Sequence, residues 1–217
     1  MCGRFTQKSE RPDIQLAFYI DEWKSDVIVS YNVTPGQRAG VVYKHNDRIY
    51  FDLFRWGLIP GWSKDPKIGF KMINARAETV HQKPSFKRSF KSRRCLIPVN
   101  GFFEWKTEEK RKTPYYIFLK DLPLFSLAGL WDEWISPERI KIYTFTIVTT
   151  EANELVAAIH EKKRMPVIIG KQDRDLWLNI QSYEKDLLEL LAPYDTKKMD
   201  AYEVSRVGPE IMGLPPR

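Results

Sequence analysis

The sequence is poor in cysteine and histidine and has no long apolar run. Two cysteines in 217 residues exclude the multi-disulfide framework of small secreted proteins, and leave open a single Cys2–Cys95 bond. With three scattered histidines, they also predict no structural zinc site. No apolar run approaches the ~18 residues that a membrane-spanning helix needs, and the first residues lack the apolar segment of a signal peptide. We therefore expect an intracellular, cytoplasmic protein without a membrane partner.

Basic residues outnumber acidic ones, and the chain is rich in aromatics. Lysine and arginine total 35 against 28 acids, which gives a formal net charge of +7 and a pI near 9.3. This balance favours a polyanionic partner such as nucleic acid. Seven tryptophans, ten tyrosines and twelve phenylalanines can fill a core or stack on bases. The length and the 43% hydrophobic content predict one domain over residues 1–217.

The local patterns predict strands more often than helices. Residues 39–44 and 48–55 predict a hairpin around His45, Asn46 and Asp47, and residues 114–120, 124–131 and 139–149 predict antiparallel neighbours. Helices are expected at 13–22, at 151–160 after a Thr150 cap, at 171–179 and at 183–192. Because strands and helices do not alternate as βαβ units, we expect an α+β fold. It would be a single domain with a largely antiparallel, curled or barrel-like sheet and surrounding helices.

Cys2 gains unusual chemistry if Met1 is removed, because its α-amine and thiol then lie on adjacent carbons. An amine condenses with an aldehyde to an imine, and the thiol can close a five-membered thiazolidine. Ordinary pKa values near ~8 for the amine and ~8.5 for the thiol leave a usable fraction of each nucleophilic at neutral pH. The opening five residues alone favour a simpler interpretation, a small residue without chemistry.

The densest positive stretch covers residues 83–94 and contains no acid. Phe86 and Phe90 lie four residues apart, so a helical turn would bury both rings and point the cations outward, as phosphate binding requires. The basic residues are Lys83, Lys87, Arg88, Lys91, Arg93 and Arg94. We favour phosphate contact over a merely solvated basic face. Such contacts position a nucleic acid without reading its sequence.

Three further places offer polar groups for a site. Asn74, Arg76 and Glu78 would project from one face of an extended chain, although an Arg76–Glu78 ion pair explains them as well. Glu104 stands in an aromatic run, where burial would raise the pKa of its carboxyl into the range of a general acid or base. A surface glutamate is the equal alternative. His160 ends an apolar helix, where a packed histidine is commoner than a catalyst.

Several different blocks of distinctive residues are distributed along most of the chain. They comprise Cys2–Phe5, Thr34–Gly36, Trp56–Pro60, Asn74–Thr79, Arg94–Trp105, Ala128–Trp131, Thr149–Asn153, His160 and Arg164–Pro166. In kind and in order they resemble the SRAP (SOS response-associated peptidase) family, whose members link covalently to abasic sites in single-stranded DNA. This resemblance favours the chemical interpretation of Cys2, Asn74, Glu104 and His160.

The resemblance implies an abasic site processing protein of the DNA damage response. Cys2, as the mature N-terminus, would trap the ring-opened aldehyde in a thiazolidine crosslink that shields the lesion. Glu104 would donate the proton for ring opening and imine formation, His160 would relay a proton or polarise the sugar oxygen, and Asn74 would orient the sugar or the new N-terminus. The expected DNA contacts are Arg4, Arg76, Lys83, Lys87, Arg88, Lys162 and Arg164, with Trp62 supporting stacked bases.

The same resemblance implies lyase-type chemistry at Cys2 and peptidase-like removal of Met1, a step that a methionine aminopeptidase could equally perform. We expect a monomer without cofactor or metal, and association with the nucleoid if the source is bacterial. Its partner would be single-stranded DNA containing abasic sites, because no duplex stacking must be broken to present the lesion. The sequence identifies no replication-associated partner.

One departure from the family concerns the histidine block. The family places its arginine two residues after the histidine and directly before Met-Pro, whereas Glu161, Lys162 and Lys163 separate His160 from Arg164 here. Lys162 therefore occupies the usual spacing. Either the helix end holds two extra residues, or the basic contact has moved.

Two other functions stay open. In an N-terminal-nucleophile amidohydrolase, the amine of Cys2 would serve as the base for its thiol. A noncatalytic nucleic-acid-binding module would use residues 83–94 and bind in a salt-sensitive way.

Overall fold

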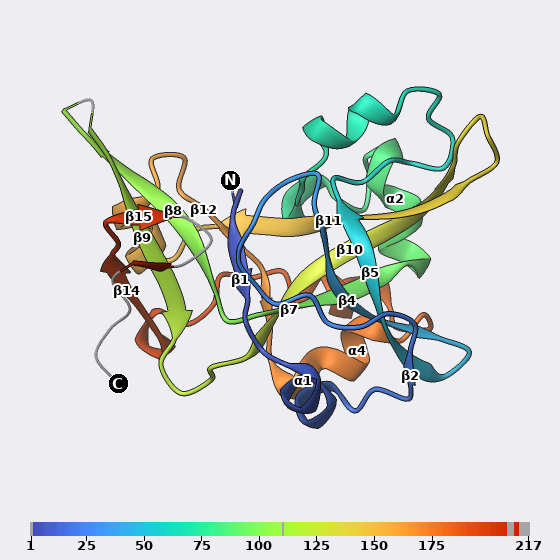
Figure 1. Cartoon of the computed structure of the whole chain (residues 1–217), viewed down its shortest axis with the longest axis horizontal. Coiled ribbons are helices and arrows are strands. Elements are labelled where there is room, and N and C mark those ends of the chain that lie inside the picture. Colours follow the sequence, from blue (N-terminus) through green and yellow to red (C-terminus); the bar gives the residue numbers. More distant parts are fainter. Residues whose placement is uncertain (1, 110, 208–210, 213–217) are drawn as a thin grey trace.

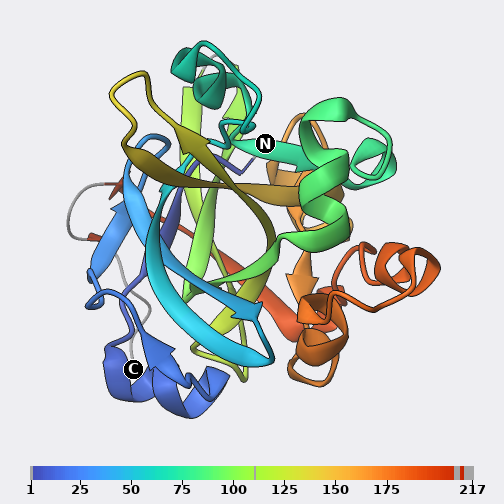
Figure 2. The same cartoon turned by 90° about the vertical axis from the view of Figure 1, so that its right-hand side faces the viewer.

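Five strands close into a barrel in the computed structural model, which describes residues 2–109, 111–207 and 211–212 (Figure 1). The strands pair in the order β11, β10, β7, β4, β5, and β5 pairs again with β11 to close the ring (Figure 2). This closing pair is parallel, with Thr144 opposite Arg55 and Phe145 opposite Trp56, whereas the other four pairs are antiparallel. The barrel strands are β4 (Arg38–His45), β5 (Arg48–Trp56), β7 (Arg94–Val99), β10 (Phe125–Ile135) and β11 (Lys141–Glu151).

A second, antiparallel sheet lies beside the barrel and carries the N-terminal strand (Figure 1). Its order is β14, β9, β8, β1, β3, and β8 follows β7 after the single residue Asn100. The side chain of Asn100 fixes this bend, because it accepts from the Lys8 amide at 2.7 Å and donates to the Pro123 carbonyl at 2.6 Å. The strands are β1 (Phe5–Gln7), β3 (Ser30–Val33), β8 (Gly101–Glu108), β9 (Arg111–Leu119) and β14 (Met199–Glu203).

Short helices flank these two sheets, and short strands extend the barrel sheet or form a separate two-stranded sheet. The α-helices are α1 (Arg11–Phe18), α2 (Pro84–Ser92), α3 (Glu154–Ile159), α4 (Arg174–Leu178) and α5 (Glu184–Glu189). The 3₁₀ helices are η1 (Pro66–Lys71), η2 (Ala77–Thr79), η3 (Lys171–Asp173) and η4 (Thr196–Lys198). The short strands are β2 (Glu22–Trp23), β6 (Asn74–Arg76), β12 (Arg164–Pro166), β13 (Ile168–Ile169), β15 (Arg206–Val207) and β16 (Ile211–Met212). Helix α2 packs on β7 and β10, and α3 packs on β8, β12 and β14.

Aromatic rings fill the junction of the barrel with the second sheet. The ring centroid of Phe5 lies 4.9 Å from that of Trp56, and Trp56 stacks on Phe145 at 6.2 Å. The indole nitrogen of Trp56 donates to the carbonyl oxygen of Ile73 at 2.9 Å, so its burial leaves no unpaired donor. Burying a phenylalanine contributes roughly 1.5–3 kcal/mol. These contacts hold β1 against the barrel and place the residues before it at the barrel's edge.

The predicted α+β fold with a barrel-like, largely antiparallel sheet is confirmed. The predicted hairpin is β4 and β5, joined at Asn46 and Asp47, whose φ angles of 48° and 59° suit a tight turn. The prediction that 114–120 and 124–131 are neighbours is wrong. Strand β9 lies in the second sheet, whereas both edges of β10 are taken by β7 and β11 in the barrel.

The predicted helices are shorter than expected. Helix α1 ends at Phe18 because Tyr19 adopts a left-handed backbone with φ 53°. Asn153, not Thr150, caps α3: its side-chain oxygen accepts from the Val156 amide at 3.0 Å, and Thr150 belongs to β11. Residues 171–179 divide into η3 and α4. Among the residues described, no helix is long and apolar enough to cross a membrane.

Candidate functional site

Cys2 is fully buried just before β1. Strand β1 pairs with β8 so that Phe5 lies opposite Phe102, and the Arg4 carbonyl accepts from the Phe103 amide at 2.9 Å. Because the two strands are antiparallel, the chain before Phe5 runs alongside the chain after Phe103. Cys2 and Glu104 are therefore neighbours.

Cys2 and Cys95 are both free thiols, so they do not form the disulfide that the sequence left open.

Glu104 of β8 is a buried carboxyl, with only 2% of its surface exposed. Burial raises its pKa from the ordinary 4.5 to about 7, and the positive charge of the N-terminus partly opposes this rise. Near neutral pH the side chain therefore exists in both protonation states. This is the property required of a general acid or base.

His160 lies at the C-terminal end of α3, where its side chain faces Glu104 of β8. Its Nε2 lies 3.5 Å from Glu104 Oε2, and its Nδ1 lies 3.0 Å from the carbonyl oxygen of Arg164. Desolvation lowers the pKa of His160, which favours the neutral imidazole. A neutral ring beside a carboxyl of elevated pKa can exchange a proton with it.

Asn74 joins this group from β6. Its side-chain nitrogen donates to the main-chain carbonyl of Cys2 at 2.9 Å. Strand β6 runs parallel to β11, with Asn74 opposite Ile147, so the barrel itself sets the position of the amide. The structure thus brings together Cys2, Asn74, Glu104 and His160 from three separate parts of the fold.

The thiol of Cys2 is held in its protonated form. Burial raises its pKa well above the usual value, and the nearby Glu104 carboxylate raises it further. Because the thiolate is the reactive nucleophile, this thiol is a poor nucleophile by itself.

Arg4 lies beside the same group and is held by two contacts. Its guanidinium donates to Asn32 Oδ1 at 3.0 Å and lies 5.8 Å from the ring centre of Trp105. No local pattern points to Asn32, because its partner Arg4 is 28 positions away in the sequence. Strand β3 brings it next to β1.

Arg164 and Glu78 form an ion pair that the sequence did not predict. Both terminal nitrogens of Arg164 contact the Glu78 carboxylate, with Nη2–Oε2 at 3.0 Å, and Nη2 also donates to the Thr149 carbonyl at 2.6 Å. This bond lowers the pKa of Glu78. Among the described residues Glu78 pairs with Arg164 and not with Arg76, although the charge of the exposed Arg76 also lowers the pKa of Glu78.

The turn between α3 and β12 absorbs the unusual spacing of the histidine block. Lys162 and Lys163 are exposed in this turn, and Lys163 takes a left-handed backbone with φ 46°. Arg164 enters β12 directly before Met165. The turn therefore holds the extra residues, and Arg164 keeps the place before Met-Pro.

Within the basic stretch of residues 83–94, Pro84–Ser92 forms α2, and Phe86 and Phe90 are buried as predicted. Lys83, Lys87 and Arg88 are exposed. Arg94 differs from them, because it is buried and donates to four carbonyl oxygens at 2.6–2.8 Å, those of Phe90, Lys91, Trp177 and Asn179. Its role is structural.

Trp62 lies on the loop between β5 and η1 and is 63% exposed. The neighbouring Ser63 carbonyl accepts from the indole nitrogen of Trp134 at 2.7 Å, which ties this loop to β10. The exposed ring is accessible to a base.

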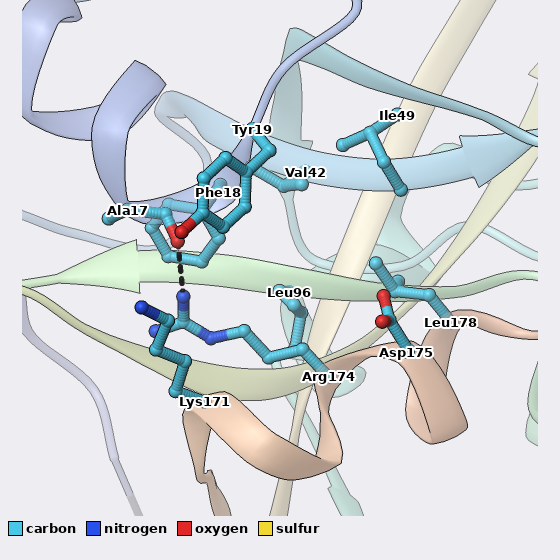
Figure 3. Close-up of a pocket in the computed structure, with 10 residues that line it drawn as sticks. All are labelled: Ala17, Phe18, Tyr19, Val42, Ile49, Leu96, Lys171, Arg174, Asp175 and Leu178. Atoms are coloured by element: carbon cyan, nitrogen blue, oxygen red, sulfur yellow. Dashed lines mark hydrogen bonds between the residues drawn. The ribbon is translucent and has the colours of Figure 1, made fainter.

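A cavity of about 230 Å³ lies between α1, β4 and α4, and none of the site residues lines it (Figure 3). Arg174 crosses it, donating to the Ala17 carbonyl at 2.7 Å and lying 4.1 Å from the Phe18 ring centre. This arginine fixes α4 to α1. Within the described part of the chain, no group of three or more histidine, cysteine and acidic residues is placed to hold a metal ion.

Comparisons with known proteins find similar sequences and structures along most of the chain. The model of the SOS response associated peptidase (SRAP) family matches residues 1–208. The abasic site processing protein YoqW of Bacillus subtilis is 47% identical over 209 residues, covering 94% of this chain and 92% of the relative. The abasic site processing protein YobE of the same organism is 44% identical over 218 residues, covering 98% and 99%. A crystal structure of a Bacteroides thetaiotaomicron protein superimposes with a TM-score of 0.85 at 33% identity, covering 94% of this chain and 92% of that one.

Proposed function

The chain belongs to the SOS response associated peptidase (SRAP) family, and from this premise we propose that it processes abasic sites in single-stranded DNA by bonding to them through Cys2. The observation that carries the proposal is the meeting of groups at the start of β1. Asn74 binds the Cys2 carbonyl at 2.9 Å, and Glu104 and His160 approach each other at 3.5 Å beside it. An acid–base pair next to an amine and a thiol is what aldehyde capture requires.

The reaction begins after removal of Met1, when the α-amine of Cys2 adds to the aldehyde carbon of the ring-opened deoxyribose. Protonated Glu104 gives a proton to the departing hydroxyl, water leaves, and a C=N bond forms. The thiol then adds across this bond. Sulfur bonds to the former aldehyde carbon, the thiol proton passes to nitrogen, and a thiazolidine closes. The net change is the loss of one water molecule.

The electrostatics of the site support this order of steps. The elevated pKa of Cys2 keeps the thiol protonated until the imine is in place, so the amine reacts first. The pKa of Glu104, about 7, lets the carboxyl donate a proton at neutral pH and take one back. His160, neutral at that pH, can carry the thiol proton toward nitrogen.

Lyase and peptidase chemistry would share this site. An imine at the sugar promotes elimination of the neighbouring phosphate, which cuts the strand, and closure of the thiazolidine removes the imine before that happens. Glu104 could also reverse the steps and release the DNA. The family description supports peptidase-like removal of Met1 at the same cysteine.

The DNA strand would be held by cations on both sides of Cys2. Arg4 follows Cys2 by two residues, and Arg76 shares β6 with Asn74. The carbonyl oxygen of Arg164 contacts His160 Nδ1 at 3.0 Å, and Lys162 lies on the adjoining turn. On α2, Lys83, Lys87 and Arg88 would add phosphate contacts. The exposed ring of Trp62 would stack on a base.

The test is incubation with single-stranded DNA that contains one abasic site, followed by a denaturing gel. We expect a shifted band with the natural chain and with Cys95→Ala, which removes the other buried thiol, and no band with Cys2→Ala. A band that survives Cys2→Ala would overturn the assignment. Turnover of small amides without any band would instead support an N-terminal-nucleophile amidohydrolase. Salt-sensitive binding indifferent to the lesion and to Cys2 would support a noncatalytic binding module.

A further inference from the structure

A basic cavity of about 280 Å³ lies where the barrel closes, apart from the four site residues. Three cations from three strands line it: Arg38 of β4, Arg55 of β5 and Lys141 of β11. Arg38 and Arg55 are opposite each other in the β4–β5 register. The remaining lining residues are Leu53, Ile142 and Tyr143, so none of the described residues that line this cavity is acidic.

The charges of these cations are largely unopposed. Arg38 donates to the Leu53 carbonyl from Nη2 at 3.0 Å, and Arg55 lies 5.6 Å from the ring centre of Phe70; neither contact neutralises a charge. Lys141 lies 3.5 Å from Glu133, whose side chain is 25% exposed, and this pairing offsets one of the three charges. The cavity therefore keeps a net positive charge of about two, which suits a phosphate group.

The cavity is connected to the site by short stretches of chain. Trp56, which follows Arg55, packs on Phe5 of β1 at 4.9 Å. Phe70, which contacts Arg55, precedes Asn74 by four residues, and four residues span at most about 14 Å. One strand of B-form DNA advances about 3.4 Å per phosphate, so about four nucleotides cover that distance, and fewer do so in an extended strand.

We infer that this cavity binds a phosphodiester of the same DNA strand, on one side of the abasic nucleotide held at Cys2. The inference rests on the function proposed above and deepens it, because it assigns a second contact point on the flanking strand. Phe70 is 60% exposed beside Arg55 and offers a ring on which the adjacent base can stack. The lesion is then bound with a flank of about four nucleotides on that side.

The experiment uses single-stranded oligonucleotides with the abasic site near the 5′ or the 3′ end, in which the opposite flank is lengthened one nucleotide at a time. Dissociation constants and crosslinking rates are measured for the natural chain, for Arg38→Gln with Arg55→Gln, and for the control Lys185→Gln with Lys198→Gln. The control removes the same charge from exposed positions on α5 and η4. Circular dichroism and melting temperatures verify the fold of each variant.

We expect the natural chain and the control to bind on the order of fivefold to tenfold tighter once one flank reaches about four nucleotides. The Arg38 and Arg55 variant should lack this gain, and its slope of log affinity against log salt should be smaller by about 1.4. Its crosslinking rate at saturating DNA should equal that of the natural chain.

The inference would be overturned if lengthening the flank tightened binding equally in all three proteins. It would also be overturned if a separate undamaged strand, added alongside a short abasic oligonucleotide, tightened binding as much as the covalently attached flank does. In either case the crosslinked band persists, so the proposed function stands. Absence of the band in the natural chain would remove the proposed function and this inference with it.

Discussion

The side chain of Asn74 donates a 2.9 Å hydrogen bond to the main-chain carbonyl of Cys2, and this bond joins the barrel to the second sheet. The two residues are 72 positions apart. The amide oxygen of Asn74 is also buried, and no donor reaches it from elsewhere in the described chain. In the proposed mature protein, an amine on Cys2 would supply that donor. We therefore expect Asn74 to fix the direction in which the N-terminus presents its nucleophile.

Replacing Asn74 with aspartate should slow crosslinking on the order of tenfold to hundredfold, because a carboxylate cannot donate to the Cys2 carbonyl and the nucleophile is misplaced. The measurement is the rate of band formation at saturating DNA. Asn46→Asp makes the same amide-to-carboxylate change at the β4–β5 turn and should leave the rate unchanged. Equal rates for Asn74→Asp and the natural chain would remove Asn74 from the site.

The elevated pKa of Glu104 should make stability fall as pH rises. The folded-state pKa is about 7 against 4.5 ordinarily, so between these values the folded chain holds a proton that the unfolded chain has released. The free energy of unfolding then decreases from pH 4.5 to 7, by up to about 3 kcal/mol. Glu104→Gln stays neutral and should lack this decrease. Its free energy of unfolding, measured in urea, should therefore rise relative to that of the natural chain as the pH approaches and passes 7.

The control for this prediction is Glu108→Gln, at an exposed glutamate of the same strand. It should follow the pH dependence of the natural chain. If Glu104→Gln also follows it, the carboxyl of Glu104 is ionised as readily in the folded protein as in the unfolded chain, and its role as a proton donor near neutral pH fails.

Neutralising Glu78 should tighten binding to single-stranded DNA. Arg164 stays oriented without this partner, because its Nη2 also donates to the Thr149 carbonyl at 2.6 Å. Glu78→Gln thus releases a cation for phosphate, and the salt slope should steepen by about 0.7. Fluorescence anisotropy against salt measures this, with Glu189→Gln on α5 as the charge-matched control. Weaker binding of Glu78→Gln would instead mean that the carboxylate positions Arg164.

The basic residues of 83–94 should divide into two kinds. Arg94→Gln leaves four carbonyl oxygens without their buried donor and should lower the free energy of unfolding by about 3 kcal/mol or more. Lys87→Gln, on the exposed face of α2, should leave stability within about 0.5 kcal/mol and weaken DNA binding instead. Thermal melts and anisotropy on both variants separate the two roles. Equal stability of Arg94→Gln and the natural chain contradicts the structural assignment.

Local chemistry in the sequence predicted the parts of the fold that depend on neighbours in the chain. The Asn46–Asp47 turn and the burial of Phe86 and Phe90 are of this kind. Pairing between distant strands was not predictable, because nothing local distinguishes β9, which joins the second sheet, from β10, which joins the barrel. Thr150 was predicted to cap α3, but the observed cap is Asn153, because β11 continues to Glu151 and thus beyond the predicted end of the strand.

The site divides in the same way. The aromatic surroundings of Glu104 left a surface glutamate as an equal alternative, and the family resemblance favoured a chemical role. The structure shows that the residue is buried. Asn32 and the Glu78–Arg164 ion pair could not be selected, because their partners lie 28 and 86 positions away. The side chain of Arg94 points inward because the carbonyl oxygens of Trp177 and Asn179, in and just after α4, accept its hydrogen bonds. These acceptors are distant in the sequence, so the direction could not be predicted.

The central claim is that Cys2, once Met1 is removed, forms a thiazolidine with an abasic site. Intact mass spectrometry of the purified chain, alone and after reaction with abasic single-stranded DNA, tests it most directly. We expect a free chain that lacks Met1, and an adduct whose mass is the sum of chain and oligonucleotide less one water. Cys2→Ser should give no such adduct that survives denaturation and acid. A chain that lacks Met1 and still shows no mass increase with abasic DNA would contradict the account.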